Sequence, residues 1–329
     1  MIYITQGGRC GNQLFSYAFA KKVLRQHKDE KLTFVLSAIK NKAKSTNYGD
    51  YWEDSLSYFN IESYDVSFEK DIIGLKGNRV QNFDKYLWRI CRKINTTIAE
   101  ITGKEFTRRA IVQNDLIYKI TAKHGVYYIT HGFCDSIPRC NAVNKFIYGS
   151  FEDIRWFDDI KDELIEEFTP KNEINSECKR MFELVTSTNS VCISLRKWSI
   201  DVHEKSELEK REICTKDYYQ NAIKSIRGKI KNPVFVVFSD DIPWAVDMIK
   251  GVVGSETKII GEKGCNNVAE KLYVMTACKH FVIANSTFSW WAAYLAKHTE
   301  KIVISPSRWF NSNPNYHPLI LQEWKTIDC

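Results

Sequence analysis

The stretch Val234-Phe235-Val236-Val237-Phe238-Ser239-Asp240-Asp241-Ile242-Pro243 joins an unbroken apolar run to a polar end and a proline. A continuous apolar run of this length predicts a strand that is buried on both faces, because a strand with one solvated face would alternate apolar and polar residues. Pro243 suits the first turn of a following helix. The stretch therefore predicts one strand–helix unit of a parallel sheet.

The same alternation of strand and helix extends through the second half of the chain. Strands are predicted at 191–195, 234–238, 258–260, 281–284 and 301–305, and helices at 215–227, 243–251, 267–278 and 287–297. The first half opens in the same way, with strands at 2–5, 31–36 and 126–130, a helix that begins near residue 12, and an amphipathic helix at 83–101. Alternating strands and helices indicate an α/β fold.

The length of the chain and the end of an acidic helix near its middle suggest two domains. The chain has 329 residues, and a domain commonly holds about 150. An acidic helix ends near Pro170–Asn175, so we place an N-terminal α/β domain at 1–172 and a C-terminal Rossmann-like domain at 173–329. Two such Rossmann-like domains would face a central cleft, where strand ends and helix N-termini meet a ligand.

Composition excludes several classes of protein. Hydrophobic residues make up 44% of the chain and charged residues 26%, which excludes a disordered or collagen-like protein. No window approaches about 18 apolar residues, so we expect no transmembrane helix. We also expect no signal peptide, because a strand begins at the first residues. The ten scattered cysteines then predict reduced thiols in a cytoplasmic protein.

The positive charge is concentrated in one segment. The chain carries 47 basic and 40 acidic residues, a net charge of +7. Residues 76–124 contain 11 Lys and Arg against 4 acids, also a net +7. The helix at 83–101 has one apolar face made by Phe83, Tyr86, Leu87, Ile90, Ile94, Ile98 and Ile101. Its other face carries Lys85, Arg89, Arg92 and Lys93, which we interpret as a solvated surface, and this argues against nucleic-acid binding.

The first strand leads into a glycine-rich turn, Gly7-Gly8-Arg9-Cys10-Gly11-Asn12-Gln13. Glycines let the backbone turn tightly beside a ligand, and the N-terminus of the next helix attracts anions. Asn12 could instead cap that helix. Both interpretations stay open at this point.

Polar residues follow two of the buried strands in the second half. Arg196 comes directly after the strand at 191–195, where a guanidinium can hold a phosphate with two hydrogen bonds. Ser239, Asp240 and Asp241 follow the strand at 234–238, where carboxylates can bind ribose hydroxyls or base amino groups. Capping of the helix that Pro243 begins is the alternative role for these acids.

A third polar group, Asn285-Ser286-Thr287-Phe288-Ser289-Trp290-Trp291, follows the strand at 281–284. Hydroxyls and free N–H groups at a helix N-terminus can cradle a phosphate, and the two tryptophans could form a wall for a base or sugar. A capped helix with buried tryptophans is the alternative. The dispersed histidines show no metal-ligand spacing, so we expect no metal site.

Four motifs, in order along the chain, resemble those of the bacterial α-1,2-fucosyltransferase family. The turn at 7–18 is similar to Gly-Gly-x-Gly-Asn-Gln-Met-Phe-x-Tyr-Ala with one residue inserted, and it also resembles a loop of protein O-fucosyltransferases. Residues 238–241 resemble Phe-Ser-Asp-Asp, 285–291 resemble Asn-Ser-Ser-Phe-Ser-Trp-Trp, and 304–310 resemble Ile-Ala-Pro-x-x-Trp-Phe.

The resemblance implies a GT-B glycosyltransferase that transfers L-fucose from GDP-β-L-fucose, with inversion and without a metal or other cofactor, to O2 of a terminal galactose. The N-terminal domain would take the acceptor and the C-terminal domain the GDP-sugar. The implied catalytic residue is Arg196. The implied donor-binding residues are Arg9, Gly11, Asn12, Arg196, Ser239, Asp240, Asp241, Asn285, Ser286, Thr287 and Phe288.

Two motifs depart from the family pattern. The family's His-Val-Arg-Arg-Gly-Asp-Tyr aligns with residues 194–200, where only Arg196 is retained and Lys197 replaces the second arginine, while Asp201 lies two residues beyond the expected acid. The family's Gly-Tyr-x-Gln-Ser aligns with residues 132–136, where Asp135 replaces glutamine and is our candidate general base.

We therefore expect a cytoplasmic fucosyltransferase whose partners are GDP-fucose and a galactose-terminated glycan. The alternatives are a related GDP-sugar transferase with another acceptor or linkage, and a non-catalytic homologue that binds sugar nucleotides or glycans. A nucleic-acid-binding protein is the third alternative. The distribution of the basic residues counts against it, because many of them lie on one helix face that we interpret as a solvated surface.

Overall fold

The computed structural model of the chain describes residues 1–44, 52–69, 71, 79–102, 116–130, 137–252, 259–261, 264–311 and 319–329. The candidate base Asp135 and the motif at 132–136 lie outside these residues. The chain forms two compact units, one made of residues 1–54 and 62–160 and the other of residues 55–61 and 161–329. The domain limits proposed from the sequence, and a cleft between the domains, stay predictions.

The first unit contains a parallel sheet of five described strands in the order β3-β2-β1-β5-β4. Its strands are β1 (Ile2–Thr5), β2 (Leu32–Val35), β3 (Asp65–Ser67), β4 (Val126–Thr130) and β5 (Lys145–Ser150). Its α-helices are α1 (Cys10–Gln26), α2 (Ser37–Lys44), α4 (Arg79–Thr102) and α6 (Leu116–Lys123), with 3-10 turns η4 (Ile154–Trp156) and η5 (Asp158–Ile160).

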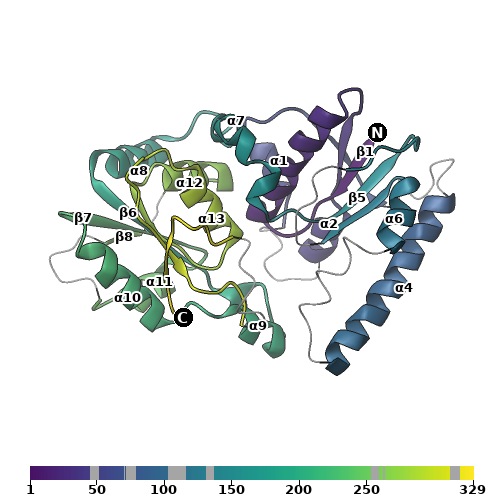
Figure 1. Cartoon of the computed structure of the whole chain (residues 1–329). Coiled ribbons are helices and arrows are strands. Elements are labelled where there is room, and N and C mark those ends of the chain that lie inside the picture. Colours follow the sequence, from purple (N-terminus) through teal and green to yellow (C-terminus); the bar gives the residue numbers. More distant parts are fainter. Residues whose placement is uncertain are drawn as a thin grey trace. The chain divides into compact units, whose positions relative to one another are not determined.

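The second unit contains a parallel sheet of six described strands in the order β11-β10-β9-β6-β7-β8 (Figure 1). Its strands are β6 (Asn189–Leu195), β7 (Pro233–Ser239), β8 (Ile259–Gly261), β9 (His280–Val282), β10 (Val303–Pro306) and β11 (Lys325–Ile327). Its α-helices are α7 (Lys161–Glu167), α8 (Ser176–Ser187), α9 (Lys205–Arg211), α10 (Lys216–Arg227), α11 (Ile242–Ile249), α12 (Val268–Thr276) and α13 (Thr287–Leu295), with 3-10 turns η2 (Ser55–Tyr58) and η6 (Trp198–Ile200).

Both faces of the second sheet are buried, as the apolar runs predict. On β6, Val191 and Ile193 pack into a core formed with helices α10 and α11, while Cys192 between them is also fully buried. Figure 1 shows α8, α12 and α13 on the face opposite to α10 and α11. The predicted α/β class with two parallel sheets is therefore confirmed.

Helix α1 has the buried stripe that its sequence predicts. Phe15, Phe19 and Val23 are each at most 1% exposed, and the ring of Phe19 stacks on that of Phe151 at 3.9 Å between centroids. This packing fixes the direction in which the chain leaves the glycine-rich turn before α1.

The amphipathic helix does not bury its apolar face and expose all of its basic residues, as the sequence predicted. In α4 the apolar side chains of Phe83, Tyr86 and Ile94 are 63%, 63% and 52% exposed, while Lys85 is only 9% exposed. The helix is oriented by polar contacts, because Gln81 Nε2 donates to the carbonyls of His124 and Asn144 at 2.8 and 2.7 Å. The Asp84 carboxylate lies 2.8 Å from His124 Nδ1 in the same contact region.

Two further expectations concern membranes and thiols. Within the described part of the chain, no helix combines the length and the apolar character needed to cross a bilayer. The cysteines whose side chains are described are all free thiols, and Cys178, Cys192 and Cys278 among them are buried.

Candidate functional site

The topology of the second sheet places three polar loops at one edge. From β6 the chain runs outward through β7 and β8 on one side, and through β9, β10 and β11 on the other. The order of the strands therefore reverses between β6 and β9, and in open parallel sheets ligands bind beyond the carboxyl ends of the strands at such a point. Arg196 follows β6, Asp240 follows β7, and Ser286 follows β9.

Arg196 is held between two carboxylates. Its Nη1 forms an ion pair with Asp240 and its Nη2 with Asp201, and the three side chains are 12%, 5% and 8% exposed respectively. The backbone N–H of Lys197 also donates to Asp240 Oδ1 at 3.1 Å. The guanidinium is thus fixed at the strand end, with its charge offset by two buried acids.

Asp201 therefore contacts Arg196, although the family pattern has its acid two residues earlier. A 3-10 turn, η6, begins at Trp198 and brings Asp201 back toward Arg196. In the sequence, Asp201 lies two residues beyond the acid of the family motif. The 3-10 turn between Arg196 and Asp201 accounts for the extra residues and could not be seen in the motif alone. The closeness of Asp201 to Arg196 in the sequence was the signal that could have predicted this pair.

Asp241 has two partners and is more accessible than Asp240. Its carboxylate accepts a hydrogen bond from Lys197 Nζ at 2.7 Å and another from the backbone N–H of Trp244 at 3.1 Å. The hydrogen bond from Lys197 is the main reason why the pKa of Asp241 lies below its usual value. Asp241 is thus the N-cap of α11, as the alternative interpretation held, and its side chain is 29% exposed.

Ser239 stabilises the same turn. Its hydroxyl accepts a hydrogen bond from the backbone N–H of Asp241 at 3.1 Å. The three polar residues after β7 are therefore held in one conformation by local hydrogen bonds.

Asn285 supports the site from within. Its side chain is 2% exposed, and its Nδ2 donates to the carbonyls of Arg211 and Trp309 at 2.9 and 3.0 Å. Its Oδ1 accepts from the indole N–H of Trp198 at 3.4 Å. One buried amide thus connects three loops, and direct contact of Asn285 with a donor stays a prediction.

The start of α13 carries polar residues at a partly exposed helix N-terminus. Ser286 is the N-cap residue, yet its side chain makes no capping hydrogen bond. Ser286, Thr287 and Phe288 are partly exposed, at a helix N-terminus that favours anions. The two tryptophans do not line the site, because both are 0% exposed and Trp290 donates its indole N–H to the carbonyl of Leu319 at 2.7 Å.

An aromatic residue that the sequence analysis did not select lies beside the arginine. The ring of Trp198 has the guanidinium carbon of Arg196 at 5.0 Å and that of Arg211 at 5.3 Å from its centroid. These are cation–π distances. Arg211 is thus a third cation in this group of loops, after Arg196 and Lys197.

The glycine-rich turn belongs to the first unit. Gly8 has a φ of +74°, and a Cβ built on it would lie 2.8 Å from the Asn12 side chain. The N-cap of α1 is Arg9, so the idea that Asn12 caps this helix is wrong. Asn12 Nδ2 instead lies 3.5 Å from a carboxylate oxygen of Glu152, and Gly11 is buried. Donor binding by Arg9, Gly11 and Asn12 stays a prediction.

The described residues hold no group of three or more His, Cys, Asp or Glu side chains placed to bind a metal ion. The cationic groups of the second unit's site are instead Arg196, Lys197 and Arg211. Buried carboxylates, neighbouring cations and a helix N-terminus beyond parallel strands are typical of a nucleotide-binding α/β protein.

The comparisons identify the family within that class. Residues 1–328 match the family model described as Glycosyl transferase family 11, and the chain belongs to this family.

Two relatives come from Escherichia coli. An alpha-1,2-colitosyltransferase is 33% identical over 162 residues, which cover 49% of this chain and 55% of that protein. The O-antigen biosynthesis glycosyltransferase WbnK is 23% identical over 98% of this chain and 99% of its own. Galactoside alpha-(1,2)-fucosyltransferase 2 of Sus scrofa is 27% identical over 42% of this chain and 41% of its own. The family resemblance inferred from the motifs is therefore confirmed.

Solved structures give weaker likenesses. Arabidopsis thaliana FUT1, as a mutant in complex with GDP, has a TM-score of 0.47 and 11% identity over 92% of this chain and 69% of that chain. The E. coli ADP-heptose lps heptosyltransferase II has a TM-score of 0.42 and 10% identity over 99% of this chain and 89% of that chain.

Proposed function

We propose that this family 11 glycosyltransferase transfers L-fucose from GDP-β-L-fucose, with inversion and without a metal, to O2 of a terminal galactose. The proposal rests on the position of Arg196, which two carboxylates hold where the strand order reverses. The hydroxyl of Ser286, which makes no capping hydrogen bond at the start of α13, supports it. The names of the relatives, an alpha-1,2-colitosyltransferase and a galactoside alpha-(1,2)-fucosyltransferase, support the choice of a deoxyhexose.

The departure of GDP would increase the negative charge on the β-phosphate. Groups fixed in advance stabilise such a charge best, because they need not reorient during the reaction. Arg196 and the hydroxyl and N–H groups at Ser286 and Thr287 would perform this role. Two acids offset the charge of Arg196 and Asp241 pairs with Lys197, so both cations would act as positioned hydrogen-bond donors to the phosphate.

Of the two acids after β7, Asp241 suits recognition of the guanosine better. Asp240 is 5% exposed and holds Arg196, whereas Asp241 is 29% exposed. A carboxylate can accept hydrogen bonds from ribose hydroxyls or from the guanine N–H groups. Asp240 would then act by positioning Arg196.

We further propose that the domain at 173–329 binds the donor and the domain at 1–172 the acceptor. Arg9, Gly11 and Asn12 of the glycine-rich turn would complete the donor site. Inversion requires a base that removes the proton of the acceptor hydroxyl. Asp135 is the proposed base.

The test is a transfer assay with purified protein, GDP-fucose and a panel of β-galactosides in the presence of EDTA, with products detected by mass. A mass gain of one deoxyhexose on a galactoside, linked to O2 by NMR, supports the proposal. Loss of transfer with EDTA that Mg²⁺ restores would contradict metal independence. Absence of measurable GDP affinity would contradict the donor assignment.

Two other functions are tested by the same assay. The similarity to the colitosyltransferase favours a donor carrying a different deoxyhexose, and faster turnover of a colitosyl donor than of GDP-fucose would establish it. A homologue that only binds would show GDP affinity without transfer from any donor. The altered motif at Lys197 is the feature that suggests this second case.

A further inference from the structure

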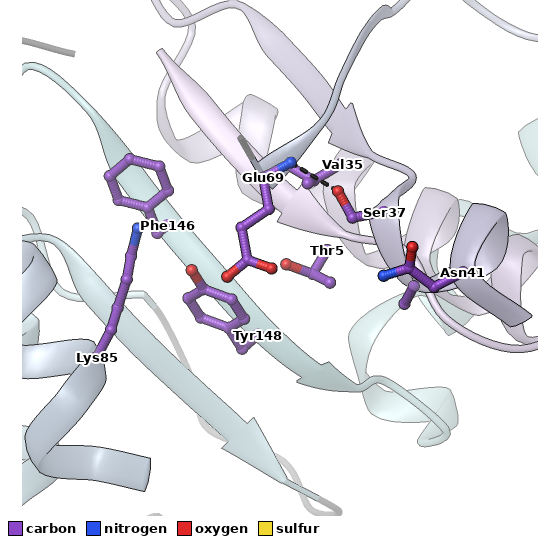
Figure 2. Close-up of a pocket in the computed structure, with 9 residues that line it drawn as sticks. Thr5, Val35, Ser37, Asn41, Glu69, Lys85, Phe146 and Tyr148 are labelled. Carbon is purple, nitrogen blue, oxygen red and sulfur yellow. Dashed lines mark hydrogen bonds between the residues drawn. The ribbon is translucent and has the colours of Figure 1, made fainter. Parts of the chain in front are cut away.

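The first unit contains a cavity of about 190 Å³ on the α4 side of its sheet. Figure 2 shows its polar side chains. The lining residues are Thr5, Val35, Ser37, Ala38, Asn41, Glu69, Lys85, Phe146 and Tyr148. They come from three neighbouring strands, two helices and the segment after β3.

The cavity lies where the strand order of this sheet reverses. The chain passes from β1 to β2 and β3 on one side, and β5 and β4 lie on the other. Thr5 is the last residue of β1 and pairs with Val35, the last residue of β2. Tyr148 of β5 lies across the reversal. This is the position at which parallel sheets bind ligands.

Glu69 brings a carboxylate to the cavity. Its backbone N–H donates to the hydroxyl of Ser37 at 2.6 Å, and its carboxylate contacts Arg89 at 3.1 Å. Figure 2 shows the carboxylate turned toward the hydroxyls of Thr5 and Tyr148. Acceptor and donor groups thus meet at one wall.

Lys85 brings an ammonium to the opposite wall. Its Nζ lies 3.7 Å from the centroid of the Phe146 ring, and the residue is 9% exposed. Among the described residues it forms no ion pair, so the ammonium is buried beside the cavity without a carboxylate partner. Burial is the main cause that lowers the pKa of Lys85 to about 8, with Glu69 opposing it.

We propose that this cavity binds a single pyranose ring of the acceptor glycan, with Glu69 and Lys85 as the residues that determine specificity. The inference rests on the proposed function. A carboxylate accepts hydrogen bonds from neighbouring sugar hydroxyls, and an ammonium and the Asn41 amide donate them. Val35, Ala38 and Phe146 supply apolar surface for the C–H face of the ring.

Size and charge both favour a neutral monosaccharide over a nucleotide. Pockets for drug-sized ligands measure about 300–1,000 Å³, so a cavity of about 190 Å³ suits one ring. One carboxylate and one ammonium line it, and the carboxylate is paired with Arg89, so the lining offers a single cation to an anionic ligand.

The experiment compares the wild type with Glu69→Gln, Lys85→Met and Thr5→Val, a substitution that keeps shape and removes one hydroxyl. Lys93→Met is the matched control, because Lys93 is an exposed residue of the same helix as Lys85 and does not line the cavity. The measurements are the acceptor KM and kcat with a β-galactoside, the Kd of GDP by calorimetry, and the binding of methyl β-galactoside by ligand-observed NMR.

We expect Glu69→Gln and Lys85→Met to raise the acceptor KM about 10- to 100-fold, as loss of a hydrogen bond to a charged group does. The Kd of GDP should be unchanged in these variants. The Lys93→Met enzyme should keep the acceptor KM of the wild type. If a charge variant does not fold, Thr5→Val must still weaken galactoside binding.

The outcomes separate this inference from the proposed function. Transfer that persists with an unaltered acceptor KM in every cavity variant overturns the cavity assignment and leaves the function standing. Binding of methyl β-galactoside that the cavity variants weaken supports the assignment even if GDP-fucose is not the donor.

Discussion

Arg196 and Asp201 form an ion pair at the end of β6, although they lie five positions apart in the sequence with a 3-10 turn between them. The turn places an acid beside the arginine, although the motif lacks an acid at the expected position. The ion pair also changes what a substitution of Arg196 would do. Removing the guanidinium would leave Asp201 and Asp240 buried without a cation.

We therefore predict that Arg196→Ala destabilises the protein by about 3–5 kcal/mol, the usual effect of breaking a buried ion pair. Chemical denaturation of the two proteins measures this. The variant is consequently a poor probe of catalysis. Equal free energies of unfolding would show that the pairs contribute nothing to stability.

Arg196→Lys is the better probe of catalysis, because it keeps the charge and removes the planar fork. We expect kcat to fall by roughly 100-fold, as when one oriented donor to a developing charge is lost. The fold should be retained, which circular dichroism can check. Turnover equal to that of the wild type would remove the guanidinium geometry from the mechanism.

Asn285→Ala should destabilise the protein, because it leaves the carbonyls of Arg211 and Trp309 without their buried donor. Each orphaned group costs about 1–3 kcal/mol. Asn311→Ala is the control, since Asn311 donates to the carbonyl of Glu209 in an exposed position. Thermal unfolding of both variants should show a large loss only for Asn285→Ala.

Ser286→Ala should change stability by no more than about 0.5 kcal/mol, because its hydroxyl does not cap α13. Thr215→Ala serves as the comparison, since the Thr215 side chain accepts from the Tyr218 N–H and its loss should cost about 1 kcal/mol. GDP affinity should fall in Ser286→Ala alone. A GDP Kd that stays constant would exclude the Ser286 hydroxyl from phosphate binding.

Gly8→Ala should distort the glycine-rich turn, whereas Gly7→Ala should not. Gly8 has a φ of +74° and a Cβ there would meet Asn12 at 2.8 Å, while a Cβ on Gly7 meets nothing within 4 Å. The left-handed conformation alone costs about 1–2 kcal/mol for alanine. Unfolding curves of the matched pair test this, and similar curves would contradict it.

Lys85 should make stability depend on pH. Its folded pKa is about 8, and its unfolded pKa is about 10.4. Between these values the unfolded chain binds more protons, so the free energy of unfolding rises with pH. Relative to Lys85→Met, the wild type should therefore gain stability from pH 8 to about 9.5. Glu69 raises and Arg89 lowers the pKa of the Lys85 ammonium, and a constant difference between the two proteins would contradict the shift.

The sequence alone determined the α/β class and the candidate residues of the second unit. Apolar runs such as 234–238 are strands because only burial on both faces tolerates them. The polar residues that follow β6, β7 and β9 then meet at one edge because parallel strands end together. Short motifs at these ends also identified the family.

Other features depended on contacts between distant segments. Strand β5 was not predicted from the sequence, although Phe146 and Tyr148 on one face of this strand line the cavity. The helical periodicity likewise predicted a solvated Lys85. In the structure, Gln81 and Asp84 on the same helix form polar contacts with the region of His124, and Lys85 is buried. The periodicity of a helix sets which residues share a face, and only the packing of the helix on its sheet decides which face is buried.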